Sequence, residues 1–256
     1  MTTLVVPLLA PITAPSVWYA TPSARKNGGT HPIWKRQGYK TAIYIDTGAP
    51  VPDCADIIIQ GEYEGYPKAV NSLCRLILAQ YPSTLIIVTG GDDMTPDPNR
   101  HPLDIQHEFL DYFQGTFGVM QPTGDRWMTD SHGKSASERI CGSPWMGKEF
   151  IQRMYGGKGP ICEEYYHFFE DEELQEVTLK LGVLWQRPDL THYHDHWLRS
   201  PQSPGNCSHP RPVRPDFLND AKLDWPNAQQ LFRTRKAAGF PGHEPLPAPI
   251  QTQFWL

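Results

Sequence analysis

Short aliphatic segments alternate with a helical pattern through the first half of the chain. The segments typical of buried strands are LVVPLL with SVWYATPS, which we group as a first strand region, TAIYID (41–46), DIIIQG (56–61) and LIIVT (85–89). PKAVNSLCRLILAQ (67–80) places apolar residues at helical spacing, with Pro67 suited to a first helical turn. Strands this apolar do not face water, so the pattern predicts an α/β fold with a mixed, mostly parallel sheet and helices on both faces.

The second half has a different texture. TFGVMQPTGDRWM predicts a strand and a turn, and ICGSPWMGKEFIQRMYGGKGP predicts a turn, a short helix and a glycine-rich loop. YYHFFEDEELQEVTLKLG predicts a helix that ends at Gly182, and VLWQRPDLTHYHDHW an extended segment.

The proline distribution suggests a boundary near residue 200. Ten of the 26 prolines follow it, with few periodic apolar runs. We therefore expect a domain over 1–199, with halves of about 1–100 and 101–199, and an irregular extension over 200–256. Trp225, Phe232 and the terminal Phe254, Trp255 and Leu256 are expected to order part of that extension.

Composition adds limits on the class of protein. A hydrophobic content of 39% and eight tryptophans suffice for a real core, and a net charge of −5 gives no global footprint for nucleic acid. Five cysteines without any CxxC spacing argue against a disulfide framework and favour a reducing cytoplasm. The apolar N-terminus lacks basic residues and contains three prolines, so neither a signal peptide nor a membrane span is expected.

Two adjacent carboxylates follow the most apolar strand, in LIIVTGGDDM. In parallel sheets ligands bind outside the carboxyl ends of the strands, and Asp92 and Asp93 fall there together with Thr21 to Ser23 and Asp46. Carboxylate oxygens are the ligands that Mg²⁺ and Mn²⁺ prefer. A solvated turn is the alternative, because GGDD is also good turn chemistry.

Two further clusters carry candidate chemistry. Glu170 and Asp171 begin a helix behind YYHFF, where partial desolvation would suit a carboxylate to general-base work; the alternative is simple stabilisation of the helix dipole. In extended HYHDHW, His192, His194 and His196 would project to one face as metal ligands. A surface cluster is the alternative there.

Several common site motifs are absent from the sequence. It contains no HExxH, GxGxxG or GxSxG, and GGKGP (156–160) lacks the spacing of a phosphate-binding P-loop. Zinc peptidase, dinucleotide and P-loop chemistry are therefore not supported.

In their order, these pieces resemble a glycosyltransferase of the GT-A fold over residues 15 to 197. The resemblance implies that the loop Thr21, Pro22 and Ser23 binds the nucleotide and that Asp46, at a strand end, contacts its base. The other elements that carry the resemblance are the helix PKAVN, LIIVTGGDDM, the Gly156 and Gly157 loop, Glu170 with Asp171, and HYHDHW. The metal motif is GDD rather than DxD. The resemblance implies that Asp93 is the metal ligand and that Asp92 contacts the ribose or a metal-bound water.

The resemblance also implies a reaction. A nucleoside-diphosphate sugar, most simply a UDP-sugar, would bind with Mn²⁺ or Mg²⁺ held by Asp93 and His194. Asp171 would act as the base towards an acceptor hydroxyl, with inversion at the anomeric carbon. Trp127, Trp145 and Glu170 would lie on the acceptor side; burial in the core is the alternative for each tryptophan.

The acceptor is suggested by a second resemblance. GDRWM, GSPWMGKEFI and DLTHYHDHW resemble a phage-associated branch that modifies hydroxymethylated pyrimidines, which implies double-stranded DNA as partner. A local phosphate-contacting patch could come from Arg211, Arg214, Lys222, Arg233, Arg235 and Lys236, against the alternative of a solvated basic face.

Three other functions stay open. One is a sugar-phosphate nucleotidyltransferase, with Arg25, Lys26, Gly28 and Gly29 in SARKNGGT as a phosphate loop. The others are transfer to a saccharide and a non-catalytic nucleotide-sugar-binding protein. The sugar, the acceptor and the oligomeric state are not determined by the sequence.

Overall fold

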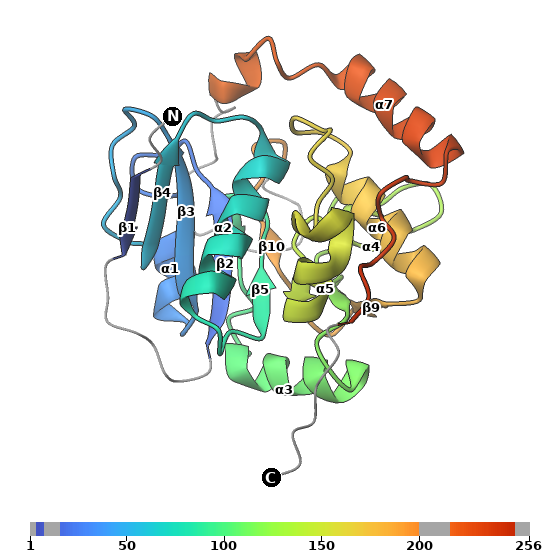
Figure 1. Ribbon diagram of the computed structural model, residues 1–256, viewed down its shortest axis with the longest axis horizontal. Helices are drawn as coiled ribbons and strands as arrows, with labels where there is room; N and C mark the ends of the chain where they lie inside the picture. Colours follow the sequence, from blue (N-terminus) through green and yellow to red (C-terminus); the bar gives the residue numbers. More distant parts are fainter. Residues whose placement is uncertain (1–3, 8–15, 200–215, 249–256) are drawn as a thin grey trace.

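The computed structural model describes residues 4–7, 16–199 and 216–248. Its centre is an eight-stranded sheet in the order β1-β4-β3-β2-β5-β8-β7-β9, beside a two-stranded sheet of β6 and β10 (Figure 1). The strands are Leu4–Pro7 (β1), Val17–Pro22 (β2), Lys40–Asp46 (β3), Ile57–Gly61 (β4), Ile86–Val88 (β5), Met94–Thr95 (β6), Val119–Pro122 (β7), Trp145–Gly147 (β8), Leu184–Arg187 (β9) and Tyr193–His194 (β10).

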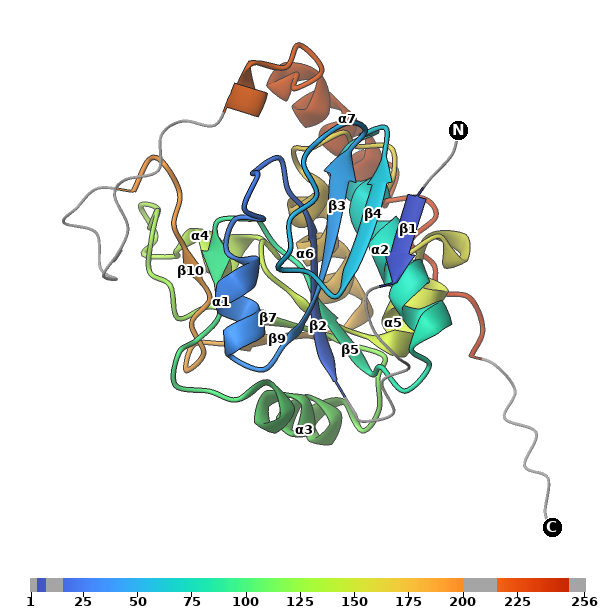
Figure 2. The same cartoon turned by 90° about the vertical axis from the view of Figure 1, so that its left-hand side faces the viewer.

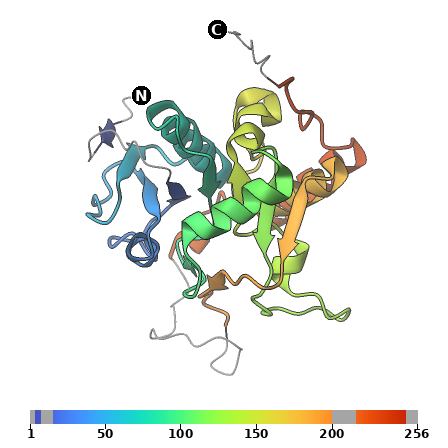
Figure 3. The same cartoon turned by 90° about the horizontal axis from the view of Figure 1, so that it is seen from below.

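Helices cover both faces of the large sheet. They are His31–Arg36 (α1), Tyr66–Gln80 (α2), Pro102–Phe113 (α3), Ala136–Arg139 (α4), Lys148–Arg153 (α5), Glu170–Leu181 (α6) and Trp225–Ala237 (α7), with 3₁₀ turns at Met154–Gly157 (η1) and Asp216–Asn219 (η2). Figure 2 shows α1 on one side of the strands and α2 with α5 on the other. α3 lies across one end of the sheet (Figure 3), and α7 lies at the opposite end, beyond α6 (Figure 1).

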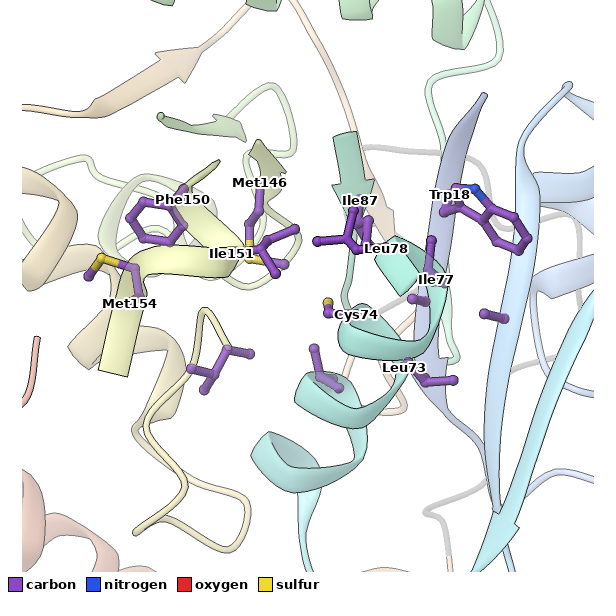
Figure 4. Packing of buried hydrophobic residues seen from close by; sticks show 14 of the residues in the cluster. Trp18, Leu73, Cys74, Ile77, Leu78, Ile87, Met146, Phe150, Ile151 and Met154 are labelled. Carbon is purple, nitrogen blue, oxygen red and sulfur yellow. The ribbon is translucent and has the colours of Figure 1, made fainter. Parts of the chain in front are cut away.

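Alternation along the central strands produces the two faces. Trp18 and Ala20 of β2 enter a core cluster with α2, α5 and α6, whereas Val17 and Tyr19 enter a second cluster with α1 and α3. Figure 4 shows the first cluster, in which the α2 side chains gather against the strands and α5. Both faces of β2 are fully buried, as the aliphatic pattern predicts.

The strand order changes direction at β2. The chain runs from β2 to β3 and β4 on one side, then returns through α2 to β5 on the other side of β2, and these strands are all parallel. Such a reversal leaves a crevice at the carboxyl ends of the two strands that flank it. Those ends lead into Ser23 and into Gly90, so the GGDD turn lies at the switch point.

The predicted α/β class is confirmed by this sheet. The predicted strands 41–46, 56–61 and 85–89 and the helix 67–80 match β3, β4, β5 and α2 closely, and α6 stops at Gly182, whose φ is 68°. Four pairings are parallel, and β1–β4, β5–β8 and β7–β8 are antiparallel. The sheet is therefore mixed, as expected.

Some elements differ from the sequence-based expectation. β1 is a separate edge strand antiparallel to β4, rather than part of a first strand region with β2. Trp145–Gly147, expected in a turn, forms β8, and the helices α1 and α3 were not predicted. β8, with three residues, and α1, with six, are too short to show a periodic pattern, whereas the twelve residues of α3 are long enough and its apolar spacing was missed.

The C-terminal segment packs onto α6. Trp225 and Phe232 of α7 lie 4.7 and 5.6 Å from the ring of Phe169, measured between ring centroids. Both residues thus contact the start of α6, while Phe254, Trp255 and Leu256 lie outside the described residues. Within the described part, no helix is both long and apolar enough to cross a bilayer.

Candidate functional site

The GGDDM turn after β5 is fixed by hydrogen bonds to all five of its carbonyls. The donors are Thr21 Oγ1 to Gly90, Tyr19 Oη to Gly91 (2.6 Å), Thr30 N to Asp92 (2.9 Å), Asp195 N to Asp93 (2.9 Å) and Trp34 Nε1 to Met94 (2.7 Å). Most of these donors belong to β2 and the loop and helix that follow it. The turn is therefore held rigidly across the switch point, with both carboxylates in fixed positions.

Asp92 binds the loop that follows β2. Its carboxylate accepts hydrogen bonds from Ser23 Oγ at 2.6 Å and from Arg25 Nε at 3.0 Å. Burial raises the pKa of Asp92, while the Arg25 guanidinium and the Ser23 hydroxyl counteract part of that rise. Asp92 thus links the two strand ends.

Part of the predicted nucleotide loop, Thr21 to Ser23, is engaged in contacts with the GGDDM turn. Thr21 is fully buried, and its hydroxyl donates to Gly90 O. Pro22 is partly exposed, and Ser23 is buried against Asp92. Gly29 approaches the turn so closely that an added Cβ would lie 2.1 Å from Asp92 O. The glycines of SARKNGGT therefore have a packing role here, independent of any phosphate loop.

Asp93 faces a histidine that is a hundred residues away in the chain. His194 Nε2 lies 3.2 Å from Asp93 Oδ1, and β10 brings it there by pairing His194 with Met94 of β6. Burial alone raises the pKa of the Asp93 carboxyl, but the imidazoles of His194 and His196 and the Arg25 guanidinium outweigh it, so the net pKa lies below the ordinary value. Asp93 is therefore an anion at neutral pH.

The donor set fits a divalent cation that is completed by other ligands. Neighbouring ligands of an octahedral ion lie about 3 Å apart when each is about 2.1 Å from the metal, close to the 3.2 Å between Asp93 Oδ1 and His194 Nε2. Among the described residues no group of three or more His, Cys, Asp or Glu side chains is arranged to hold a metal. The protein would supply two ligands, which suits a cation bound jointly with phosphate oxygens and water.

The three histidines of HYHDHW have different environments. His192 is buried, with Nδ1 2.7 Å from Ser143 Oγ and Nε2 accepting from Trp145 Nε1 at 3.2 Å, and burial lowers its pKa to about 3. The side chain of His192 is thus engaged with Ser143 and Trp145 rather than with Asp93, although it lines a small pocket together with His194. The strand β10 contains only Tyr193–His194, so strand alternation does not extend to residue 192.

His196 and Trp127 lie beside the pair formed by Asp93 and His194. The ring centroid of Trp127 is 5.3 Å from that of His194 and 4.9 Å from that of His196, and burial lowers the pKa of His196 to about 4. Trp127 also lines a small pocket with His194 and Met94. It therefore remains a candidate for contact with a substrate.

Trp145 does not lie on a substrate-facing surface. Its side chain is fully buried in the second core cluster, where its indole donates to His192. The expected acceptor-side role is corrected by this placement: β8 lies between β5 and β7, and its Trp145 side chain enters the core on the face covered by α1 and α3.

The acidic start of α6 approaches the same strand end. Tyr66 donates to Gly90 O at 3.2 Å, with its hydroxyl 3.0 Å from Thr89 Oγ1. Burial chiefly raises the pKa of Tyr66, and the nearby carboxylates of Glu170 and Asp171 raise it further, against the lowering effect of Thr89. Asp171 O accepts from Cys141 N at 3.3 Å, and the O of the next residue, Gly142, lies 3.4 Å from a Cβ built on Gly90, so the start of α6 lies beside the segment that leads into Asp93.

Glu170 and Asp171 differ in their surroundings. Glu170 is buried, and its Oε2 has no hydrogen-bond partner. Burial and then the neighbouring Asp171 raise the pKa of Glu170 well above its ordinary value. Asp171 is half-buried, with Oδ1 accepting from Glu172 N at 3.0 Å. The two residues therefore have different chemistry: a neutral acid and a more accessible carboxylate.

Asp46 stands exposed at the end of β3. Its Oδ1 accepts from Thr47 N at 2.7 Å and from Tyr63 N at 3.3 Å. Asp46 thus lies at the carboxyl end of a strand next to β2, where the resemblance implies a contact with the nucleotide base.

Sequence reasoning missed the residues that hold these groups in place. Tyr19, Tyr66, Asp125 and Arg199 all bond to backbone of the site. No local pattern marks Tyr19, Tyr66 or Asp125, because their partners are 24 to 72 residues away in the chain. Arg199 bonds both to His194, five residues away, and to the distant Asp125.

Comparisons with known proteins add little. No family model matches the sequence, and no curated protein matches it. Among solved structures, one that is similar is a crystal structure of a Drosophila β-1,4-galactosyltransferase 7 mutant in complex with manganese, UDP-Gal and xylobiose. It is 10% identical to this chain, with 75% of each chain covered and a TM-score of 0.39. A likeness this low does not assign a function.

Proposed function

We propose that this protein is a metal-dependent glycosyltransferase of the GT-A class, which transfers a sugar from a nucleoside-diphosphate sugar, such as a UDP-sugar, to an acceptor hydroxyl. The observation that carries the proposal is the Asp93–His194 pair, 3.2 Å apart at the β2/β5 switch point, with the acidic start of α6 nearby. A cation site beside a general base is what displacement of a diphosphate requires.

The donor would lie across the carboxyl ends of β2, β3 and β5. Asp46 is exposed there for the base, and Pro22 and Ser23 border the loop for the nucleotide. Asp92 holds that loop through Ser23 and Arg25 and would also reach the ribose or a metal-bound water.

Asp93 and His194 would hold Mn²⁺ or Mg²⁺. Bound there, the cation supplies Lewis-acid stabilisation of the charge on the departing diphosphate. Asp93 is well suited because its carboxylate is ionised and is fixed by the bonded turn.

Asp171 would accept the proton of the acceptor hydroxyl as that oxygen attacks the anomeric carbon, which inverts the configuration. Glu170 is a poor proton acceptor at neutral pH, because burial raises its pKa and keeps it protonated. Its buried, unpartnered oxygen would instead form a hydrogen bond to a substrate hydroxyl.

The acceptor is open between a hydroxymethylated pyrimidine of DNA, as the resemblance implies, and a saccharide. Part of the expected phosphate-contacting patch is engaged elsewhere: Arg235 is buried on Glu173, and Lys236 pairs with Glu176 at 2.6 Å. Arg211 and Arg214 lie outside the described residues. Mass spectrometry of hydroxymethylated oligonucleotides and of free saccharides, each incubated with UDP-sugars and Mn²⁺, distinguishes the two acceptors.

Two substitutions test the proposed roles. Asp171→Asn should lower transfer by about two to four decades, the usual worth of a general base, while UDP binding stays near that of the wild type. Asp93→Ala should weaken metal-dependent UDP binding as well. Calorimetric titration with UDP and Mn²⁺ and a UDP-release assay measure both effects. Near-native turnover of the Asp171→Asn protein would contradict the assignment of the base.

The released product separates the rival functions. A glycosyltransferase releases UDP, a nucleotidyltransferase releases pyrophosphate from NTP and sugar phosphate, and a binding protein releases neither. Incubation with both substrate sets distinguishes these outcomes.

A further inference from the structure

A buried ion pair holds the backbone of His194 from both sides. Asp125 Oδ2 accepts the N–H of His194 at 3.1 Å, and Arg199 Nε donates to the C=O of His194 at 2.8 Å. Arg199 Nη2 closes the arrangement by pairing with the same Asp125 Oδ2. Two guanidinium nitrogens of Arg199 and one carboxylate oxygen of Asp125 thus join both backbone groups of His194.

The pair is placed deep in the protein. Asp125 is 7% exposed and Arg199 is 5% exposed. The guanidinium carbon of Arg199 lies 4.0 Å from the ring centroid of Tyr193 and 5.1 Å from that of Trp127. Trp127 in turn packs edge-on against the His194 ring at 5.3 Å. The aromatic contacts therefore fix the plane of the guanidinium as well as the ring of His194.

Folding alone does not explain an ion pair in this position. Burying two charges costs desolvation energy, and an apolar pair of similar volume is often at least as stable. The segment also needs support, because β10 and β6 contribute only two residues each to their ladder. The charged pair adds what an apolar pair cannot: fixed hydrogen bonds to the backbone of one chosen residue.

We propose that Asp125 and Arg199 are positioning residues that hold His194 against Asp93 in the geometry needed for a divalent cation. This inference rests on the metal site of the proposed function. It assigns the two residues a role that acts through the backbone of His194.

Binding of Mn²⁺ tests the proposal without any measurement of transfer. Free Mn²⁺ is followed by electron paramagnetic resonance while protein with UDP is titrated. Arg199→Lys keeps the charge but loses the planar fork that serves Asp125 and His194 together. We expect Mn²⁺ affinity to fall by about 10- to 100-fold, as for other residues that orient metal ligands. Asp125→Asn should give a smaller loss, because its amide oxygen can still accept from His194 N.

Arg187→Lys is the matched control. Arg187 is also buried, at 6% exposed, and is paired in a fork with Asp189 at 2.6 and 2.7 Å, but it contacts neither His194 nor Asp93. Its substitution should lower thermal stability to a similar extent and leave Mn²⁺ affinity unchanged. An equal loss of affinity in both arginine variants would show a general loss of stability and overturn the proposal.

A double-mutant cycle with His194→Ala separates the positioning role of Arg199 and Asp125 from the metal-binding role of His194. If Arg199 acts through His194, Arg199→Lys causes no further loss of affinity in the His194→Ala protein. If His194→Ala weakens binding but Arg199→Lys and Asp125→Asn stay within about twofold of the wild type, the positioning role is wrong. If His194→Ala itself binds Mn²⁺ normally, the metal assignment in the proposed function fails instead.

Discussion

At the scale of single residues, Gly91 shows why a buried strand ends in two glycines before two carboxylates. A Cβ at position 91 would lie 2.5 Å from Asp93 Oδ1, so the Asp93 carboxylate folds back over a backbone that only glycine leaves open. The glycine of the GGDD turn and the position of the Asp93 carboxylate are therefore linked. The alternative of a merely solvated turn does not account for this close approach.

Gly91→Ala should separate folding from metal binding. The atom displaced is the end of a side chain, so the protein should fold with a melting temperature close to that of the wild type. The Asp93 carboxylate has to rotate away from His194, and Mn²⁺ affinity should fall by about tenfold or more. Thermal unfolding and Mn²⁺ titration measure the two effects.

Gly115→Ala is the control for that substitution, because an added Cβ there meets no atom within 4 Å. It should change neither quantity. Unchanged Mn²⁺ affinity in the Gly91→Ala protein would mean that the Asp93 position is not critical.

At the scale of elements, α6 shows how one sequence pattern contains several roles. All four residues of its first turn are acidic, which by itself suits the helix dipole. Glu173 is fully buried and accepts from Arg235, Tyr155 and Tyr165, whereas Glu170 is buried with an unpartnered oxygen. Asp171 and Glu172 are left as the two half-buried carboxyl groups. The pattern predicted the helix start, and only packing separated the four side chains.

His192, directly before β10, should make the stability of the protein depend on pH. The pKa of His192 falls from 6.5 to about 3 because the ring is buried, so the unfolded chain binds a proton that the folded protein excludes. Its contribution to stability is complete above about pH 6.5 and is lost as the pH falls towards 3, by about 1.4 kcal/mol for each pH unit. His31 and His196, whose pKa values fall to about 4, add to this slope.

His192→Gln should remove one of these contributions. Urea unfolding between pH 4.5 and 6.5 should show a stability that depends on pH less steeply than in the wild type, by about 1.4 kcal/mol per unit. The exposed His132→Gln serves as control and should keep the wild-type slope. Equal slopes in all three proteins would show that the His192 ring is protonated in the folded state.

At the scale of the whole molecule, α7 is anchored to α6 by one buried ion pair, although Arg235 is its only buried residue. Arg235 of α7 forms a fork with Glu173 of α6, with both N–O distances at 2.8 Å, and the two side chains are 4% and 0% exposed. α7 thereby stabilises α6, the helix that carries Asp171.

Arg235→Met should be strongly destabilising. It leaves the buried Glu173 carboxylate without its cation, a change that costs about 3–5 kcal/mol. Lys236→Met, which removes the exposed pair with Glu176, should cost no more than about 1 kcal/mol. Urea unfolding compares the two, and a small loss in the Arg235→Met protein would show that α7 is independent of α6.

The sequence by itself determined the elements and the strand ends. Hydrophobic periodicity identified β3, β4, β5 and α2, because burial on both faces and helical spacing are local properties. It also placed Asp46 and the Asp92–Asp93 pair at carboxyl ends of strands, since a strand's end is visible in its own segment. The strand order depends on contacts between distant segments, and so does the antiparallel pairing of β8 that buries Trp145. Neither could be predicted from a local pattern.

The tertiary structure decided which of these groups meet. Only long-range pairing brings His194 to Asp93 while His192 enters the core, and only packing places Arg199 and Asp125 around the His194 backbone. Those contacts depend on the relative positions of segments far apart in the chain. No periodic pattern encodes such positions, because each is set by the combined burial of many side chains.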